Sequence, residues 1–167
     1  MTGDRDLFQL VDDSRPVRII YTARGLSKLD MIDEAAITAR YQIPGRAYAD
    51  FATLRGDPSD GLPGVAGVGD KTAAALVRTF GSVEAIMAAI DKGHGGFPGG
   101  SRAKVAAARD YLAVAPAVVR VATDAPVPPV DGSLPVSPAD PAALADLDAR
   151  WDLGTSLRRA VAALSGD

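Results

Sequence analysis

Four aspartates occur as two close pairs in short turn-forming segments, and carboxylates in such positions can bind a divalent metal ion. Asp4 and Asp6 lie in Thr-Gly-Asp-Arg-Asp, and Asp57 and Asp60 lie in Gly-Asp-Pro-Ser-Asp. Mg²⁺ and Mn²⁺ prefer oxygen ligands, and two such ions about 4 Å apart can activate a water for phosphodiester cleavage. Taken alone, either pair is better explained by the preference of Asp for turns, where its side chain accepts hydrogen bonds from backbone N–H groups.

A glycine-rich turn follows the second pair and leads into a predicted helix. Its glycines let the backbone approach a ligand, and the first helical turn offers unpaired N–H groups and the positive end of the helix dipole. Such a hairpin can hold a phosphate without reading a base, but a plain helical hairpin packed through glycines explains the pattern equally well. A Walker-type loop is disfavoured, because Lys71 stands two residues beyond Gly69. The candidate phosphate-binding residues are Gly64, Val65, Gly67, Val68, Gly69, Lys71 and Thr72.

Length and composition indicate a folded globular protein. The 167 residues are 47% hydrophobic and 23% charged, which fits one domain or one domain plus an appendage. Absence of cysteine removes thiolate metal sites and cysteine nucleophiles. No signal-like start or long apolar run is visible, so we expect a cytoplasmic protein without a membrane partner. Residues 61–120 carry seven Lys and Arg against four Asp and Glu, which fits either a polyanion-binding face or a solvated helix surface.

The hydrophobic spacing predicts a mainly α protein with one or two short strands. A β-branched run predicts a strand at 18–22, and a second short strand is expected at 118–122. Residues 126–138 are rich in proline and predict an extended connection. Leu157, Val161 and Leu164 form an apolar stripe typical of a core-facing helix. The predicted helices span 33–41, 44–54, 70–80, 82–92, 101–114, 139–149 and 155–164.

Three ordered motifs make the sequence resemble the bacterial 5′-3′ exonuclease family, which includes the nuclease domains attached to DNA polymerase I and the flap endonucleases. The motifs are Thr2 to Leu10, Tyr48 to Asp60 and Leu62 to Ala73, and the similarity continues through Phe80-Gly81-Ser82, Thr123 to Pro126 and Trp151 to Leu164. The resemblance implies the helical C-terminal part of a PIN-like nuclease with a helix-hairpin-helix, or helix-three-turn-helix, motif. It divides the chain into a truncated nuclease part (1–60), a helix-hairpin-helix subdomain (61–125) and an extended connection with C-terminal helices (126–167).

The resemblance also implies roles for the residues that match the family motifs. Asp4, Asp6, Asp57 and Asp60 match acidic metal ligands, with Asp4 between two Mg²⁺ sites and the other three nearest the second ion. No catalytic residue beyond these ligands is implied. Residues 65–72 match the hairpin that grips duplex DNA, in which main-chain carbonyls hold K⁺. Gly61 departs from the family, which usually has Asn there.

The larger departure lies before the first motif. Family members carry further strands, a helical arch and more metal ligands there, so we expect this chain to be catalytically incomplete and to need the missing N-terminal half. The leading hypothesis is the C-terminal portion of a Mg²⁺- or Mn²⁺-dependent 5′-3′ exonuclease and flap endonuclease, acting as a monomer on double-stranded DNA with 5′ ends or flaps. The alternative is a non-catalytic, sequence-independent DNA-binding module. A small-molecule enzyme using His94 is disfavoured, because no nucleophile stands beside this lone histidine.

Overall fold

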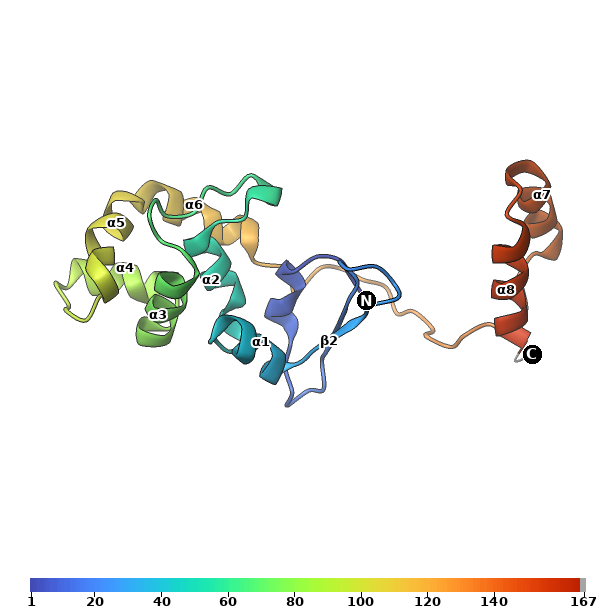
Figure 1. Ribbon diagram of the computed structural model, residues 1–167, viewed down its shortest axis with the longest axis horizontal. Helices are drawn as coiled ribbons and strands as arrows, with labels where there is room; N and C mark the ends of the chain where they lie inside the picture. The colour runs from blue at the N-terminus through green and yellow to red at the C-terminus, as the bar shows by residue number, and fades with distance from the viewer. Residues whose placement is uncertain (166–167) are drawn as a thin grey trace. The chain divides into compact units, whose positions relative to one another are not determined.

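The structure, a computed structural model, describes residues 1–165. They form two compact units, divided between Thr123 and Asp124, and each is mainly helical (Figure 1), as the sequence predicts. The first unit contains the short 3-10 helices η1 (Asp6–Leu10), η2 (Gly45–Ala47), η3 (Pro58–Asp60) and η4 (Pro98–Gly100), the strands β1 (Ile19–Tyr21) and β2 (Asp30–Ile32), and the helices α1 (Glu34–Tyr41), α2 (Tyr48–Arg55), α3 (Asp70–Phe80), α4 (Val83–Asp91), α5 (Ser101–Ala107) and α6 (Arg109–Val119). The second unit contains α7 (Pro141–Trp151) and α8 (Gly154–Ser165).

The β structure is one small antiparallel pair. β1 confirms the strand expected at 18–22, and its partner β2 was not predicted, because a three-residue strand that begins with Asp carries no β-branched run. Backbone groups on the other edge of β1 form hydrogen bonds with the start of the chain. The Thr2 N–H donates to the Ile20 carbonyl and the Thr22 N–H donates to the Thr2 carbonyl, each at 2.9 Å. These bonds fix the start of the chain, and with it the first aspartate pair, beside β1.

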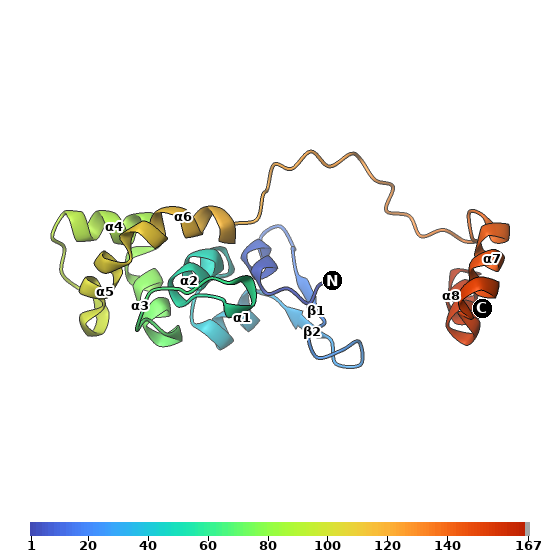
Figure 2. The same cartoon turned by 90° about the horizontal axis from the view of Figure 1, so that it is seen from above.

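Helix α2 is the central element of the first unit. Every residue from Tyr48 to Leu54 is buried, and the helix packs against α3 and α6 (Figure 2). Phe8 of η1, Tyr41 of α1 and Phe51 of α2 gather around Tyr48, with neighbouring ring centroids 5.2–6.4 Å apart. Residues 1–60 and 61–123 therefore share one hydrophobic core, and the aromatic cluster holds η1 against α2.

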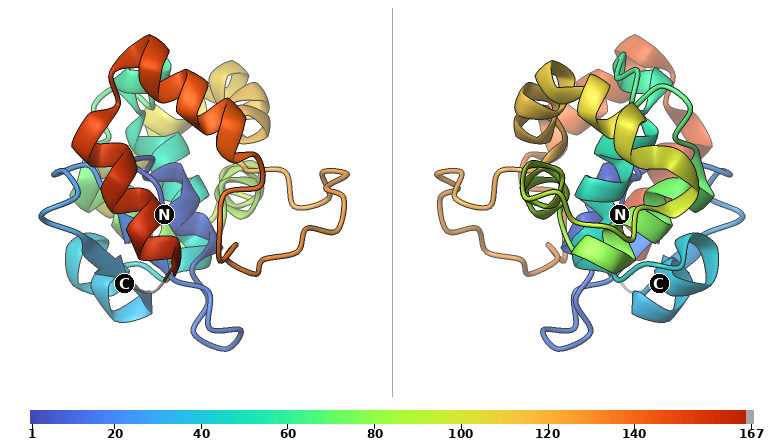
Figure 3. Two further views of the ribbon diagram at one scale, coloured as in Figure 1. Left: turned by 90° about the vertical axis from the view of Figure 1, so that its right-hand side faces the viewer. Right: turned by 90° about the vertical axis from the view of Figure 1, so that its left-hand side faces the viewer.

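The α3–α4 hairpin confirms both helices predicted at 70–80 and 82–92. Gly81, with φ +96°, ends α3, and the Ser82 hydroxyl accepts a hydrogen bond from the Ala85 N–H at 3.2 Å to cap α4. Figure 3 (right) faces this end of the unit, where α3, α4 and α5 lie together. Within the described residues no single helix is long and apolar enough to cross a membrane, and only α3 and α4 together, bent by 75°, meet that test.

Residues 101–122 differ from the sequence prediction in two ways. The single helix expected at 101–114 is broken at Ala108 into α5 and α6. The strand expected at 118–122 is wrong, because α6 continues to Val119 even though Pro116 lies inside it. Burial outweighs the missing N–H of the proline here: Leu112, Ala115, Pro116 and Val119 all face the core.

The second unit is a pair of helices after an extended segment. α7 and α8 confirm the helices predicted at 139–149 and 155–164, and the Asp140 carboxylate caps α7 by accepting from the Ala143 N–H at 2.9 Å. Leu157, Val161 and Leu164 are half-buried, and the first two face Leu144 of α7 across a shallow hollow. The predicted stripe is therefore the packing face of α8 within this unit.

Two glycines allow the chain to cross itself after α2. A Cβ atom on Gly64 would lie 2.4 Å from the Arg55 carbonyl oxygen, and one on Gly56 would lie 2.7 Å from the Gly64 nitrogen. Both glycines have positive φ, +68° and +86°. The Val65 N–H then donates to the Leu54 carbonyl at 2.9 Å, which ties the glycine-rich loop to the end of α2. Gly64, a candidate phosphate-binding residue, is thus packed against the chain's own backbone.

We expect Gly64→Ala to lower the free energy of unfolding by at least about 2 kcal/mol, because the new methyl group meets backbone atoms that cannot move away. Gly69→Ala is the matched control: its Cβ would meet nothing within 4 Å and its φ is −99°, so the change should stay within about 0.5 kcal/mol. Urea denaturation of the two variants measures the difference. Equal stability would contradict a packing role for Gly64.

Candidate metal centre and nucleic-acid interface

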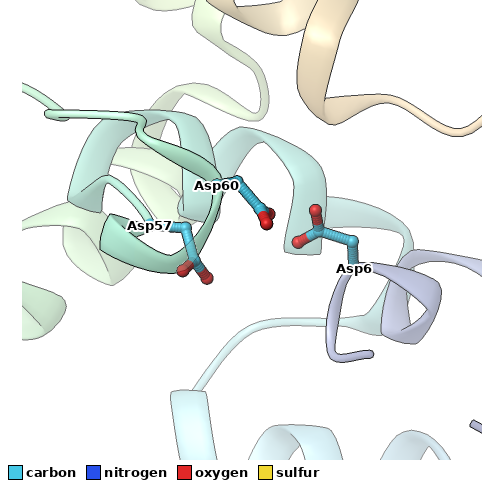
Figure 4. A group of neighbouring side chains, drawn as sticks. All are labelled: Asp6, Asp57 and Asp60. Carbon is cyan, nitrogen blue, oxygen red and sulfur yellow. The ribbon is translucent and has the colours of Figure 1, made fainter. Parts of the chain in front are cut away.

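Three carboxylates converge beside the C-terminal end of α2. Asp6, from η1, faces Asp57 and Asp60, from the turn that contains η3 (Figure 4). One oxygen from each side chain lies within 4.8 Å of the other two. Asp6 is distant in sequence from the other two, and the aromatic contact of Phe8 with Tyr48 brings η1 to this place.

The turn that carries Asp57 and Asp60 is formed by its own residue types. The Asp57 Oδ1 atom accepts hydrogen bonds from the Ser59 N–H, at 3.1 Å, and from the Ser59 hydroxyl. Pro58 begins η3, and Gly61 ends it in the left-handed region at φ +70°. A two-way backbone pairing of Asp57 with Leu62, both bonds at 3.0 Å, closes the loop. Both carboxylates are therefore held on one tight, closed turn.

Asp57 is the buried member of the three, with a relative exposure of 4%. The hydrogen bond from the Ser59 hydroxyl, with the charges of Arg5 and Arg55, holds the pKa of this carboxyl below its usual value. Its Oδ2 atom lies 3.2 Å from the Arg55 Nη2 and 3.7 Å from the Arg5 Nη2. Asp57 is thus ionised and has two cationic neighbours.

Asp6 has the opposite environment. Burial, and then the negative charges of Asp4, Asp60 and Asp57, raise the pKa of this carboxyl to about 6. No arginine pairs with Asp6 among the ion pairs of the described residues. A divalent cation would relieve this repulsion, which is the electrostatic signature expected of a metal ligand.

Asp4 is close to the three converging carboxylates but has a different structural role. Its Oδ1 atom accepts a hydrogen bond from the Asp6 N–H at 2.8 Å, so it fixes the backbone of Asp6. Its carboxylate is not one of the three that converge, although it lines the same hollow of about 310 Å³ with Arg5, Tyr21 and Asp60. A role for Asp4 at a second ion stays a prediction.

The glycine-rich loop points its two valines inward and Gly67 and Gly69 outward. Val65 and Val68 are buried, whereas Gly67, Gly69 and Lys71 are exposed and Thr72 is half-buried. The structure therefore divides the seven predicted residues: Val65, Val68 and Gly64 hold the loop on the protein, and the other four lie on or near its surface. The exposed loop and the N-terminal end of α3 form one face.

Lys104 belongs to this face and was missed by sequence reasoning. Its Nζ atom donates to the Gly67 carbonyl at 2.9 Å, from α5 across to the loop. The available signal was the net basic charge of residues 61–120, which identifies a region and no single residue. Arg5 and Arg55 beside Asp57 were missed as well, although Arg5 stands between the first two aspartates in the sequence.

A mainly helical fold with a cluster of three carboxylates is the arrangement that comparison with known families must account for. Residues 43–142 match the family model "5′-3′ exonuclease, C-terminal SAM fold". The chain belongs to this family.

Relatives and a solved structure agree with that assignment. The chain is 52% identical to a 5′-3′ exonuclease of Streptomyces coelicolor over 99% of its own length and 55% of the relative, and 48% identical to a 5′-3′ exonuclease of Mycobacterium tuberculosis over 98% and 54%. It is 42% identical to DNA polymerase I of Mycobacterium tuberculosis over 64% of this chain and 12% of that protein. The chain thus spans about half the length of the two exonucleases. A lysine-to-alanine mutant of T5 5′-exonuclease has a similar fold, with a TM-score of 0.57 and 19% identity over 71% of this chain and 45% of that chain.

The different environments of Asp57 and Asp60 predict opposite effects on metal-free stability. Asp57→Asn should lower the free energy of unfolding by about 2–3 kcal/mol, because it leaves the mostly covered Arg55 and the more exposed Arg5 without their negative partner. Asp60→Asn should raise it slightly, because it removes a like charge and its amide can donate to Asp6. Thermal and urea unfolding in a chelator at neutral pH measure both. An Asp57→Asn variant as stable as the unmodified chain would contradict this account of the site.

Proposed function

We propose that this chain is the carboxylate-bearing, duplex-binding portion of a Mg²⁺-dependent 5′-3′ exonuclease and structure-specific flap endonuclease that hydrolyses DNA phosphodiesters. The observation that carries the proposal is the convergence of Asp6, Asp57 and Asp60 within 4.8 Å of one another. Membership of the 5′-3′ exonuclease family and the names of the relatives support the reaction class.

The donor set fits Mg²⁺ or Mn²⁺, because all three side chains offer hard oxygen ligands and the pKa of one of them, Asp6, is raised by burial and then by neighbouring negative charge. Asp6, Asp57 and Asp60 would hold one ion, and Asp4 is the nearby candidate for a second. When bound, such ions would activate a water molecule and neutralise charge on the phosphate. The chain's own residues orient the ligands: Ser59 and Arg55 fix Asp57, and Asp4 fixes the backbone of Asp6.

Arg5 is placed to meet the substrate. It lines the acidic hollow, its side chain is 42% exposed, and its 3.7 Å separation from Asp57 is the longer of the two arginine contacts. Arg55, by contrast, is 15% exposed, stacks over Phe51 and donates to the Gly56 carbonyl at 2.9 Å. A phosphate that enters the hollow would therefore recruit the more exposed Arg5 guanidinium, while Arg55 stays with Asp57.

The glycine-rich face would bind the phosphate backbone of double-stranded DNA that carries a 5′ end or flap. Gly67 and Gly69 allow close approach, the α3 N-terminus offers N–H groups, and Lys71 and Lys104 add positive charge. We also propose K⁺ at the carbonyls of this loop, where it would share the Gly67 oxygen with Lys104 or displace its ammonium group. We further propose that the protein acts as a monomer on the DNA of the nucleoid, in the cytoplasm.

DNA binding should be independent of sequence and should weaken steeply with salt, with a slope of roughly −0.9 in log K against log salt per neutralised phosphate. Gly69→Val should weaken binding to all duplexes alike, because a side chain there stands between the backbone and the phosphate. Gly95→Val is the matched control, since Gly95 also has open space around it and no positive φ, but lies in another loop. Fluorescence anisotropy with unrelated duplexes measures both, and a Gly69→Val variant that changes sequence preference while keeping affinity would contradict phosphate binding.

Cleavage separates the enzyme from the alternative of a non-catalytic DNA-binding module. The chain alone should bind DNA but cut it very slowly or not at all, whereas a version completed to the length of its relatives should cut 5′-flap DNA with Mg²⁺ or Mn²⁺. In that version, Asp57→Asn with Asp60→Asn should suppress the rate but leave duplex affinity in Ca²⁺ largely unchanged, because Ca²⁺ satisfies oxygen ligands with looser geometry. An unchanged cleavage rate in the double variant would show that the metal ligands are misassigned, and an inactive completed protein would favour the binding module.

A further inference from the structure

The Gln9 side chain joins η1 to the end of α6 through three hydrogen bonds of its carboxamide. Its Nε2 donates to the Asp6 carbonyl at 2.8 Å and to the Val119 carbonyl at 3.0 Å. Its Oε1 accepts a hydrogen bond from the Val121 N–H at 3.1 Å. Two of these bonds connect residues more than a hundred positions apart in sequence, so a single side chain fastens η1 to the end of α6.

The same amide completes the support of Asp6. The Asp6 N–H donates to Asp4 at 2.8 Å, and the Asp6 carbonyl accepts from Gln9 at 2.8 Å, so both backbone polar groups of this residue are held by side chains. Asp6 needs this support more than Asp57 does, because no arginine among the described ion pairs compensates its charge. These two hydrogen bonds act against the repulsion of Asp6 by Asp57 and Asp60, in addition to the contact of Phe8 with Tyr48 that holds η1.

We propose that Gln9 is a positioning residue for the metal centre: it holds Asp6 within reach of Asp57 and Asp60 by fastening the η1 turn to the end of α6. The inference rests on the proposed metal-binding function. It follows that ion binding and the contact of Gln9 with residues 119–121 strengthen each other, because each favours the same position of the turn.

Mn²⁺ affinity of the purified chain, measured by titration calorimetry, tests the role of Gln9 without any cleavage assay. Gln9→Met keeps the length of the side chain but removes all three hydrogen bonds, and should weaken Mn²⁺ binding roughly 10-fold, as loss of a ligand's supporting partner does. Gln42→Met is the matched control, because Gln42 also joins two elements, by accepting from Arg78 at 3.0 Å, but lies away from the carboxylates. Its Mn²⁺ affinity should stay within about twofold of the unmodified chain.

A second measurement uses the unmodified chain and so does not depend on the folding of a variant. Saturation with Mg²⁺ should slow hydrogen exchange of the Val121 amide roughly threefold or more, because binding stabilises the turn to which this amide is joined. The Gly93 amide, which donates to the Ile90 carbonyl at 3.0 Å, should not change. Asp60→Asn should abolish the Mg²⁺ effect on Val121.

The outcomes distinguish failure of the metal site from failure of the role of Gln9. Absence of Mn²⁺ binding by the unmodified chain, or binding unaffected by Asp60→Asn, would refute the metal site and the role of Gln9 with it. If the unmodified chain binds Mn²⁺ and Gln9→Met binds it equally well, the metal site stands and only the positioning role of Gln9 is overturned. The same conclusion follows if the Val121 amide does not respond to Mg²⁺.

Discussion

Mutual repulsion of three carboxylates is the constraint on which the rest of the first unit depends. Bringing Asp6, Asp57 and Asp60 within 4.8 Å of one another costs free energy in the metal-free protein, as the raised pKa of Asp6 indicates. The fold stabilises the individual carboxylates in different ways. Asp57 is neutralised by arginines and buried, whereas Asp6 is held through its backbone and by the burial of Phe8 two positions later. A scaffold that tolerates this repulsion is what the proposed divalent-cation site requires.

Helix α2 joins that site to the glycine-rich face. The turn that carries Asp57 and Asp60 begins two residues after the last residue of α2, and the Leu54 carbonyl near the end of α2 accepts the hydrogen bond that anchors the loop at Val65. Earlier in α2, the buried Asp50 carboxylate accepts two hydrogen bonds. One comes from the Val83 N–H at the start of α4, at 2.9 Å, and the other from the Arg120 side chain beyond α6, at 3.2 Å. One fully buried helix thus sets the positions of the carboxylates and the hairpin together, so neither can shift without moving packed core residues.

Local signals explain which parts were predictable from sequence. α3 and α4 were predicted to within a residue because Gly81 and Ser82 mark their boundary, and the turn at 57–61 because each of its residues favours a turn. Long-range contacts explain the rest. Nothing near Pro116 indicates that burial keeps it helical, and nothing near Lys104 or Gln9 names a partner on a distant element. Asp4 and Asp6 look alike in sequence, yet only the fold shows that one supports the backbone of the other.

The glycines of the loop show how one motif combines two physical demands. Gly64 is required by folding, because its Cβ would overlap the Arg55 backbone. Folding does not require Gly69. Its φ is ordinary and no described residue lies close to where its Cβ would be, so a small side chain would fit there. Packing therefore accounts for the first glycine and leaves the second unexplained. Gly69 is the N-cap residue of α3, a position that favours glycine, and the close approach of a phosphate proposed above would be a second physical reason for a residue without a side chain there.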